Sequence, residues 1–149
     1  MKRKYIAVIY DEATQINLRK WCAENDFDLS ISYSGNHKEP SDFEFHTTII
    51  YSENAVDNII NDVINVNKTY IDAIGFDLFG ENADIPVLLV KSESLNAIRK
   101  CYENIGLVDY WPIFSPHISL TYAKNINVDK LLPTFSLSYD KIVIEDLEE

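Results

Sequence analysis

The chain has 149 residues, of which 46% are hydrophobic and 25% are charged. This length and composition are typical of one globular domain with a sizeable core, so we treat residues 1–149 as a single domain. The formal net charge of −11 disfavours a sequence-independent grip on long nucleic acid, which needs many lysines and arginines to neutralise phosphates.

The longest apolar runs, such as residues 85–90, are far too short to cross a bilayer, so we expect no membrane contact. The basic start of the chain leads into a brief apolar run that we interpret as a first strand and not as a signal peptide. Cys22 and Cys101 both fall in predicted helices and show no disulfide or metal spacing. These features predict a reduced, cytoplasmic protein.

In chain order, the first half predicts a buried strand over residues 4–10 and a helix over 12–25 with Asp11 as its cap. A polar stretch then leads into a strand over 43–51. Five apolar residues follow at helical spacing and predict a second helix: Val56, Ile59, Ile60, Val63 and Ile64. Residues 70–92 predict a hairpin that turns around residues 80–84.

The second half repeats this outline with a strand over 85–91, a helix over 92–106, a loop over 107–114 and a strand over 115–123. Ser92 or Ser94 is the expected cap of that helix. A last strand covers 140–147. Each half therefore runs strand, helix, loop and a strand that contains a histidine. This pattern predicts an α+β fold, with two similar lobes built from antiparallel sheets that are flanked by helices.

Each histidine strand carries a His-x-Thr/Ser pattern, His46–Thr48 in the sequence HTTI and His117–Ser119 in the sequence HISL. Because side chains alternate across a strand, each histidine and its hydroxyl emerge on one face. Ile50 is expected on the face of His46, and Thr121 on that of His117. One such pattern has little weight, since a lone strand histidine is more often structural. Two copies in equivalent places indicate a functional site.

This duplicated layout with HTTI and HISL resembles the 2H phosphoesterase superfamily, which is named for its two His-x-Thr/Ser motifs. The resemblance implies two pseudo-symmetric lobes around a central cleft, with the motifs facing each other across it. The size of the chain and its sequence FSPHISLTYA are also similar to phage-encoded members that degrade the cyclic oligonucleotide signals of CBASS antiphage defence. That likeness implies immune evasion in the host cytoplasm.

The motif residues suit phosphodiester cleavage. Two histidines of near-neutral pKa can supply both the base and the acid, and the hydroxyls of Thr48 and Ser119 can donate to the charged phosphoryl oxygens. We therefore predict a phosphodiesterase that hydrolyses 3′–5′ bonds of cyclic oligonucleotides, with His46 and His117 as the acid–base pair in either order. We expect no cofactor and no metal, because only Glu44 could share the strand faces of these histidines.

Aromatic rings usually hold bases in nucleotide sites, which makes Tyr10, Trp111 and Phe79 candidates. The resemblance favours Tyr10, although each ring also fits a place in the core or on the surface. Glu145 is a candidate to orient a histidine or touch a base, and Lys124 a candidate to hold a phosphate. A solvated terminal acid and a surface lysine are the plainer readings of these two residues.

Two other functions fit the same motifs. One is a 2′,3′-cyclic phosphodiesterase that acts on RNA ends, like the RNA-ligase-like members of the superfamily. The other is a non-catalytic sponge that binds cyclic nucleotides, although a sponge has no need of two proton-transfer groups. The expected partner is in each case a nucleotide ligand. The sequence leaves open the oligomeric state and the nucleotide preference.

Overall fold

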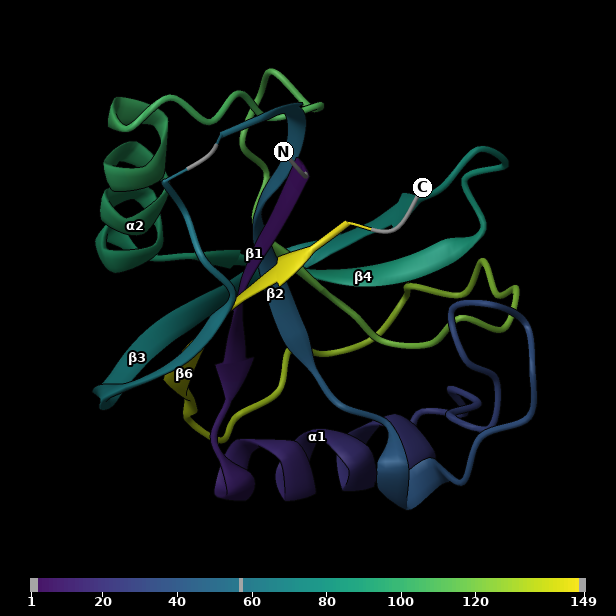
Figure 1. The fold of residues 1–149 in the computed structure, drawn as a ribbon. Helices are drawn as coiled ribbons and strands as arrows, with labels where there is room; N and C mark the ends of the chain where they lie inside the picture. The colour runs from purple at the N-terminus through teal and green to yellow at the C-terminus, as the bar shows by residue number, and fades with distance from the viewer. Residues whose placement is uncertain (1–2, 57, 148–149) are drawn as a thin grey trace.

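The computed structural model describes residues 3–56 and 58–147, and it confirms the α+β class. Within these residues an antiparallel sheet of six strands is combined with two α-helices and one short 3-10 helix (Figure 1). In chain order the elements are β1 (Arg3–Tyr10), α1 (Glu12–Glu24), η1 (Pro40–Asp42), β2 (His46–Ala55), β3 (Asp62–Phe79), β4 (Ile85–Lys91), α2 (Glu93–Asn104), β5 (His117–Ser119) and β6 (Leu137–Asp146).

The strand order in the sheet is β2-β1-β6-β3-β4-β5, and every neighbouring pair is antiparallel. The long β3 joins the two halves of the sheet. It pairs with β6 as far as Ile71 and with β4 from Asp72 onward. The two strands that carry the histidine motifs, β2 and β5, therefore stand at the opposite ends of the strand order.

The predicted repeat of strand, helix and histidine strand is confirmed. In the first half β1 is followed by α1 and then by β2, which pairs with β1. In the second half β4 is followed by α2 and then by β5, which pairs with β4. Both helices begin at a predicted cap. The carboxylate of Asp11 accepts a hydrogen bond from Thr14 N–H at 3.0 Å, and the hydroxyl of Ser92 accepts one from Ser94 N–H at 3.1 Å.

One hydrophobic core forms where the helices cover the sheet. Alternate residues of β1 turn into this core, while Tyr5 and Ile9 on the other face remain partly exposed. The core draws on both helices and every strand; fully buried members are Ile6, Val8, Leu18, Ile49, Leu88, Leu95, Ile118 and Leu120. The face of the sheet away from the helices is thereby left to the motif side chains.

The helix predicted from Val56 to Ile64 is wrong. The chain passes through a turn there, and β3 begins at Asp62. The sequence from Asp62 onward also alternates with period two, and β-branched residues favour strands. Pairing with β6 decides between the two periods, with Val63 opposite Val143 and Ile64 opposite Ile142. Residue 57 lies outside the described part.

The predicted hairpin of residues 70–92 is confirmed as β3 and β4, but the histidine strands have other bounds than expected. β2 begins only at His46, and β5 covers His117–Ser119 instead of residues 115–123. A register shift in β1–β2 sets Ile50 opposite Ile6 in the core, so Ile50 does not share the face of His46. Thr121 lies beyond the end of β5, is fully buried and donates to the Asp28 carbonyl, so it leaves the face of His117.

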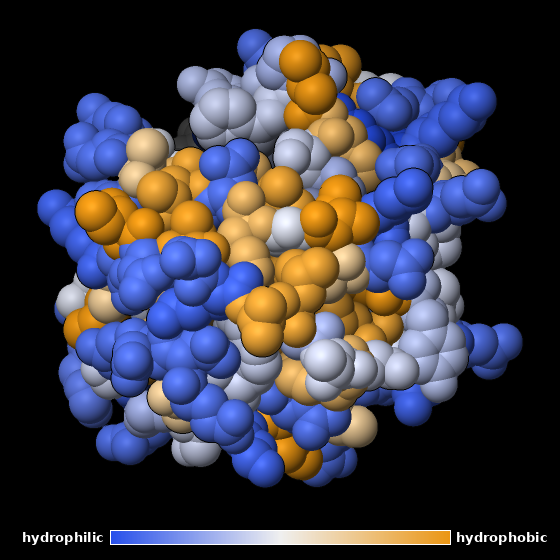
Figure 2. Space-filling model, turned by 180° about the vertical axis from the view of Figure 1, so that it is seen from behind, coloured by the Kyte–Doolittle hydropathy of each residue, from blue (hydrophilic) through white to orange (hydrophobic). Residues whose placement is uncertain are grey.

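The surface carries apolar and charged groups side by side. Seen from behind, hydrophobic side chains gather across the middle of the molecule and hydrophilic ones surround them (Figure 2). Among the described residues, no helix is both long and apolar enough to cross a membrane.

Candidate active site

The strands β2 and β5 lie close together, although they are the first and last in the strand order. The hydroxyl of Thr47 donates to the backbone carbonyl of His117 at 2.9 Å and is also 2.6 Å from the hydroxyl of Tyr10. Thr47 is fully buried, whereas its neighbours His46 and Thr48 face the other way and are half-buried. The charge of His46 acts on the pKa of His117. The two motifs therefore lie together in space.

Both histidine segments are built alike. Nδ1 of His46 lies 3.4 Å from the Glu44 carbonyl, and Nδ1 of His117 lies 2.8 Å from the Ser115 carbonyl. Because a carbonyl only accepts hydrogen bonds, each Nδ1 carries a proton and donates it. Each Nε2 is then free to take up or release a proton, and within the described residues neither Nε2 has a hydrogen-bond partner.

The backbone ahead of each histidine is held in the same way. The N–H at the end of β1, from Tyr10, donates to the Phe45 carbonyl at 3.4 Å. The N–H near the end of β4, from Val90, donates to the Pro116 carbonyl at 3.1 Å. In both halves, the strand that precedes the helix therefore fixes the residue before the histidine.

Burial lowers the pKa of both motif histidines and is the largest effect on each. For His46, the Glu44 carbonyl and the negative charges of Glu44 and Glu145 act in the opposite direction. For His117, the Ser115 carbonyl also raises the pKa, while the charge of His46 lowers it further. The pKa of each histidine is therefore lowered, and of the two only His46 has carboxylate charges that oppose this shift.

Each motif hydroxyl has a tyrosine near it. The hydroxyl of Tyr5 lies 3.1 Å from that of Thr48, and the side chain of Ser119 lowers the pKa of Tyr122. Burial raises the pKa of Tyr5 to about 12 and raises that of Tyr122, so both phenols keep their protons at neutral pH. The Tyr5 hydroxyl thereby helps to hold that of Thr48 in place.

These two tyrosines are missing from the sequence-based site, and Tyr122 was expected on the opposite face. The alternation of β1 could have found Tyr5, because Tyr5, Ala7 and Ile9 share one face, and Ala7 pairs with Thr48. No periodicity could have found Tyr122, because it follows the end of β5, where alternation no longer applies.

Two of the predicted binding residues lie beside the histidines. The ring of Phe79 is 4.5 Å from that of His117, edge to face. Glu145 stands opposite Tyr5 in the β1–β6 register, and its charge raises the pKa values of Tyr5 and His46. The turn of the β3–β4 hairpin and the end of β6 therefore border the motif face.

Comparison with known families gives this geometry a context. The family model described as anti-CBASS protein Acb1 matches residues 2–149. The chain belongs to the Acb1 family of anti-CBASS proteins. Membership associates it with evasion of CBASS immunity and with a cyclic oligonucleotide as ligand. No curated protein matches the chain.

In this Acb1-family chain, the other predicted binding residues have no described contact with either histidine. Tyr10 is 1% exposed, so it offers no ring face to a base, and its hydroxyl is used by Thr47. Trp111 is 62% exposed and its ring contacts Tyr110. Lys124 is exposed and makes no described contact with either histidine.

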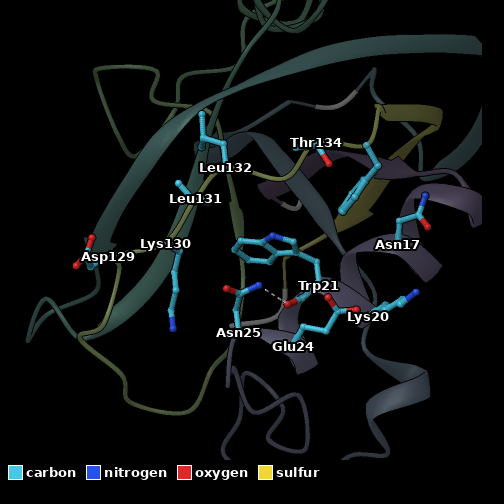
Figure 3. Close-up of a pocket in the computed structure, with 11 residues that line it drawn as sticks. Asn17, Lys20, Trp21, Glu24, Asn25, Asp129, Lys130, Leu131, Leu132 and Thr134 are labelled. Atoms are coloured by element: carbon cyan, nitrogen blue, oxygen red, sulfur yellow. Dashed lines mark hydrogen bonds between the residues drawn. The ribbon is translucent and has the colours of Figure 1, made fainter.

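The Acb1-family chain has two notable cavities, and the larger lies away from the motifs. About 570 Å³ in volume, it opens beside α1 and the segment 129–135. Its side chains include Trp21, which stacks on Phe76 at 5.9 Å, and Asn25, whose amide donates to the Trp21 carbonyl (Figure 3). The second cavity, of about 440 Å³, is lined by His46 and Tyr122. Of the two cavities, only the second is lined by a motif residue, His46.

Within residues 3–56 and 58–147, no three histidine, cysteine, aspartate or glutamate side chains are grouped as metal ligands would be. The chain provides instead two imidazoles, two hydroxyls and their tyrosine partners, which can move protons and donate hydrogen bonds to an anion.

Proposed function

We propose that this protein is a phosphodiesterase that opens cyclic oligonucleotide signals at a 3′–5′ bond by two-histidine acid–base catalysis, in the manner of the 2H phosphoesterases. The observation that carries this proposal is the pair of like-built His-x-Thr/Ser segments joined by the hydrogen bond from Thr47 to His117. Membership of an anti-CBASS family supports the choice of substrate. The repeated strand–helix–strand layout supports two pseudo-symmetric lobes.

In the proposed reaction, Nε2 of one histidine takes the proton of the ribose 2′-hydroxyl. The 2′-oxygen attacks the phosphorus, and the bond from phosphorus to the 5′-oxygen breaks. Nε2 of the other histidine gives its proton to that 5′-oxygen. The ring opens to a linear product that ends in a 2′,3′-cyclic phosphate, while the hydroxyls of Thr48 and Ser119 donate to the phosphoryl oxygens.

We assign the acid to His46 and the base to His117. Glu44 and Glu145 favour the protonated form of His46, and the charge of His46 disfavours a second proton on His117. The phosphate brought by the substrate adds negative charge and raises the pKa of the acid in the complex. Phe79, beside His117, is then placed to contact a base or a ribose.

The proposal is tested by incubating the protein with cyclic dinucleotides and trinucleotides, and with an RNA oligomer that ends in a 2′,3′-cyclic phosphate. Products are separated and identified by mass spectrometry, with and without excess EDTA. We expect linear products from the cyclic oligonucleotides in both conditions. Loss of activity in EDTA would indicate a metal site instead.

Variants connect the activity to the motif. His46→Ala and His117→Ala should each abolish turnover while the circular dichroism spectrum stays that of a folded protein. Cys101→Ala is the control, because that thiol is exposed on α2. Full activity in either motif variant contradicts the assignment.

The same assay separates the two alternatives. Turnover of the RNA end alone favours the RNA 2′,3′-cyclic phosphodiesterase, which the net charge of −11 disfavours. Recovery of unaltered ligand from a denatured complex favours a sponge. A cytoplasmic location, inside the infected host, is part of the proposal.

A further inference from the structure

Between α1 and β2 the chain forms a small hairpin (Figure 1). Four of its residues line the cavity beside His46: Ser32, Tyr33, Ser34 and Lys38. Its two sides are joined by an antiparallel bridge between Ile31 and His37, and by the bond from Lys38 N–H to the Ser30 carbonyl at 2.7 Å. Its turn contains Gly35 with a φ of +87°, a conformation that favours glycine. We name residues 30–38 the flap.

The cavity under the flap is continuous with the candidate active site. His46 lines it directly, and so does Tyr122, whose pKa the side chain of Ser119 lowers. The ring of Tyr122 lies 5.5 Å from that of Phe43, at the base of the flap. A ligand held at His46 can therefore reach into this cavity.

The side chains around the cavity suit a nucleotide. Tyr33, 88% exposed, lies edge to face with Tyr122 at 5.6 Å between ring centres, so aromatic surface borders the opening. Lys38 brings a positive charge, and within the described part of the chain it forms no ion pair. Glu44 is also in the lining, and a carboxylate can accept hydrogen bonds from a base amino group.

The volume is also suitable. At about 440 Å³ the cavity lies within the range of roughly 300–1,000 Å³ that small-molecule sites occupy. A cyclic oligonucleotide has at least two phosphates, so when one lies between the histidines another must be held outside them. Lysine is a common phosphate ligand, acting as a point charge.

We propose that the flap cavity binds the nucleotide next to the scissile bond, with its base against Tyr33 and Tyr122 and its phosphate at Lys38. This inference rests on the proposed function for the placement of the scissile phosphate. It makes the flap a recognition element for ligands that carry more than one phosphate.

Binding is measured by calorimetry in a His117→Ala parent, because His117 does not line the cavity and its loss prevents turnover. The probes are 3′,3′-cyclic di-AMP, 3′,3′-cyclic GMP–AMP and cyclic tri-AMP, with 2′,3′-cyclic AMP as the ligand that has one phosphate. We expect Lys38→Gln to raise the Kd of the cyclic oligonucleotides about tenfold and to leave that of 2′,3′-cyclic AMP unchanged. Lys100→Gln, an exposed lysine on α2, is the control for net charge.

A second pair of variants tests the ring. Tyr33→Ala should weaken binding of the cyclic oligonucleotides about tenfold, and Tyr33→Phe should bind as the parent does, because stacking needs the ring and not the hydroxyl. Because the Tyr33 side chain is exposed, circular dichroism should show an intact fold for both variants.

The outcomes separate this inference from the proposed function. Kd values within about twofold of the parent for both Lys38→Gln and Tyr33→Ala overturn the subsite, and turnover by the wild-type protein then leaves the proposed function standing. Weakened binding together with no turnover by the wild-type protein upholds the subsite and overturns the catalysis. If no cyclic oligonucleotide binds the parent and none is turned over by the wild-type protein, both are overturned.

Discussion

Replacing Thr47 by valine tests the contact that joins the two motif strands. The hydroxyl of Thr47 bonds both the Tyr10 hydroxyl and the His117 carbonyl, and Thr47 and Tyr10 are buried. Valine keeps the shape of the side chain and removes both hydrogen bonds. The buried phenol of Tyr10 is then left without a partner.

The expected loss follows from these contacts. An unpaired buried hydroxyl costs about 1–3 kcal/mol, and the lost bond to the His117 carbonyl costs about 0.5–1.5 kcal/mol. Thr47→Val should therefore lower the free energy of unfolding by about 2–4 kcal/mol. For a domain of this size that is a fall in Tm of roughly 4–16 °C. Activity should fall at least about tenfold in kcat, because the separation of the two histidines is no longer fixed.

Urea denaturation followed by circular dichroism measures the loss. Thr134→Val is the control, since that exposed threonine forms no hydrogen bond within the described residues, and a change below about 0.5 kcal/mol is expected. The double variant Tyr10→Phe/Thr47→Val removes both polar partners, so it should cost less than the sum of the single variants. A loss below about 0.5 kcal/mol in Thr47→Val, or strict additivity, would refute the reasoning.

Three further predictions concern the motif histidines, Tyr5 and Arg99. Burial lowers the pKa of both motif histidines below the usual value of about 6.5, so the protonated form of the acid is lost as pH rises through that lowered pKa. The pH profile of kcat/KM should therefore peak below about pH 6.5. A peak above about pH 7.5 contradicts this. Tyr5→Phe removes the partner of Thr48 and should lower kcat about two- to tenfold with KM unchanged, whereas steady-state kinetics that show a change in KM alone would oppose a positioning role. Arg99→Met leaves the Asp109 carboxylate buried without its guanidinium and should cost about 3–5 kcal/mol in urea unfolding, partly recovered by Asp109→Asn, and a loss below about 1 kcal/mol would disprove it.

Local patterns were sufficient to predict much of this molecule. The alternation of β1, the caps Asp11 and Ser92 and the hairpin of β3 and β4 all depend on residues close in sequence, and the structure confirms them. The two His-x-Thr/Ser patterns are local in the same sense, because neighbours two apart on a strand share a face. The sequence therefore determined which side chains each motif presents.

Pairing between distant segments decided the rest. The apolar residues from Val56 to Ile64 have helical spacing, but Val63 and Ile64 belong to β3 because they pair with β6. Tyr10 is the last residue of β1, and its side chain points into the core. Tyr5 lies on the opposite face of β1, and its hydroxyl contacts that of Thr48. A register shift removed Ile50 from the motif face.

The meeting of the two motifs is the clearest case. His46 and His117 are separated by most of the sheet in strand order, and no local pattern specifies that β2 and β5 come together. That contact includes the hydrogen bond from one buried threonine hydroxyl to the His117 carbonyl. The sequence by itself determined two half-sites, and only the tertiary structure joined them, because hydrogen bonds between distant strands form wherever the complete fold brings their partners together.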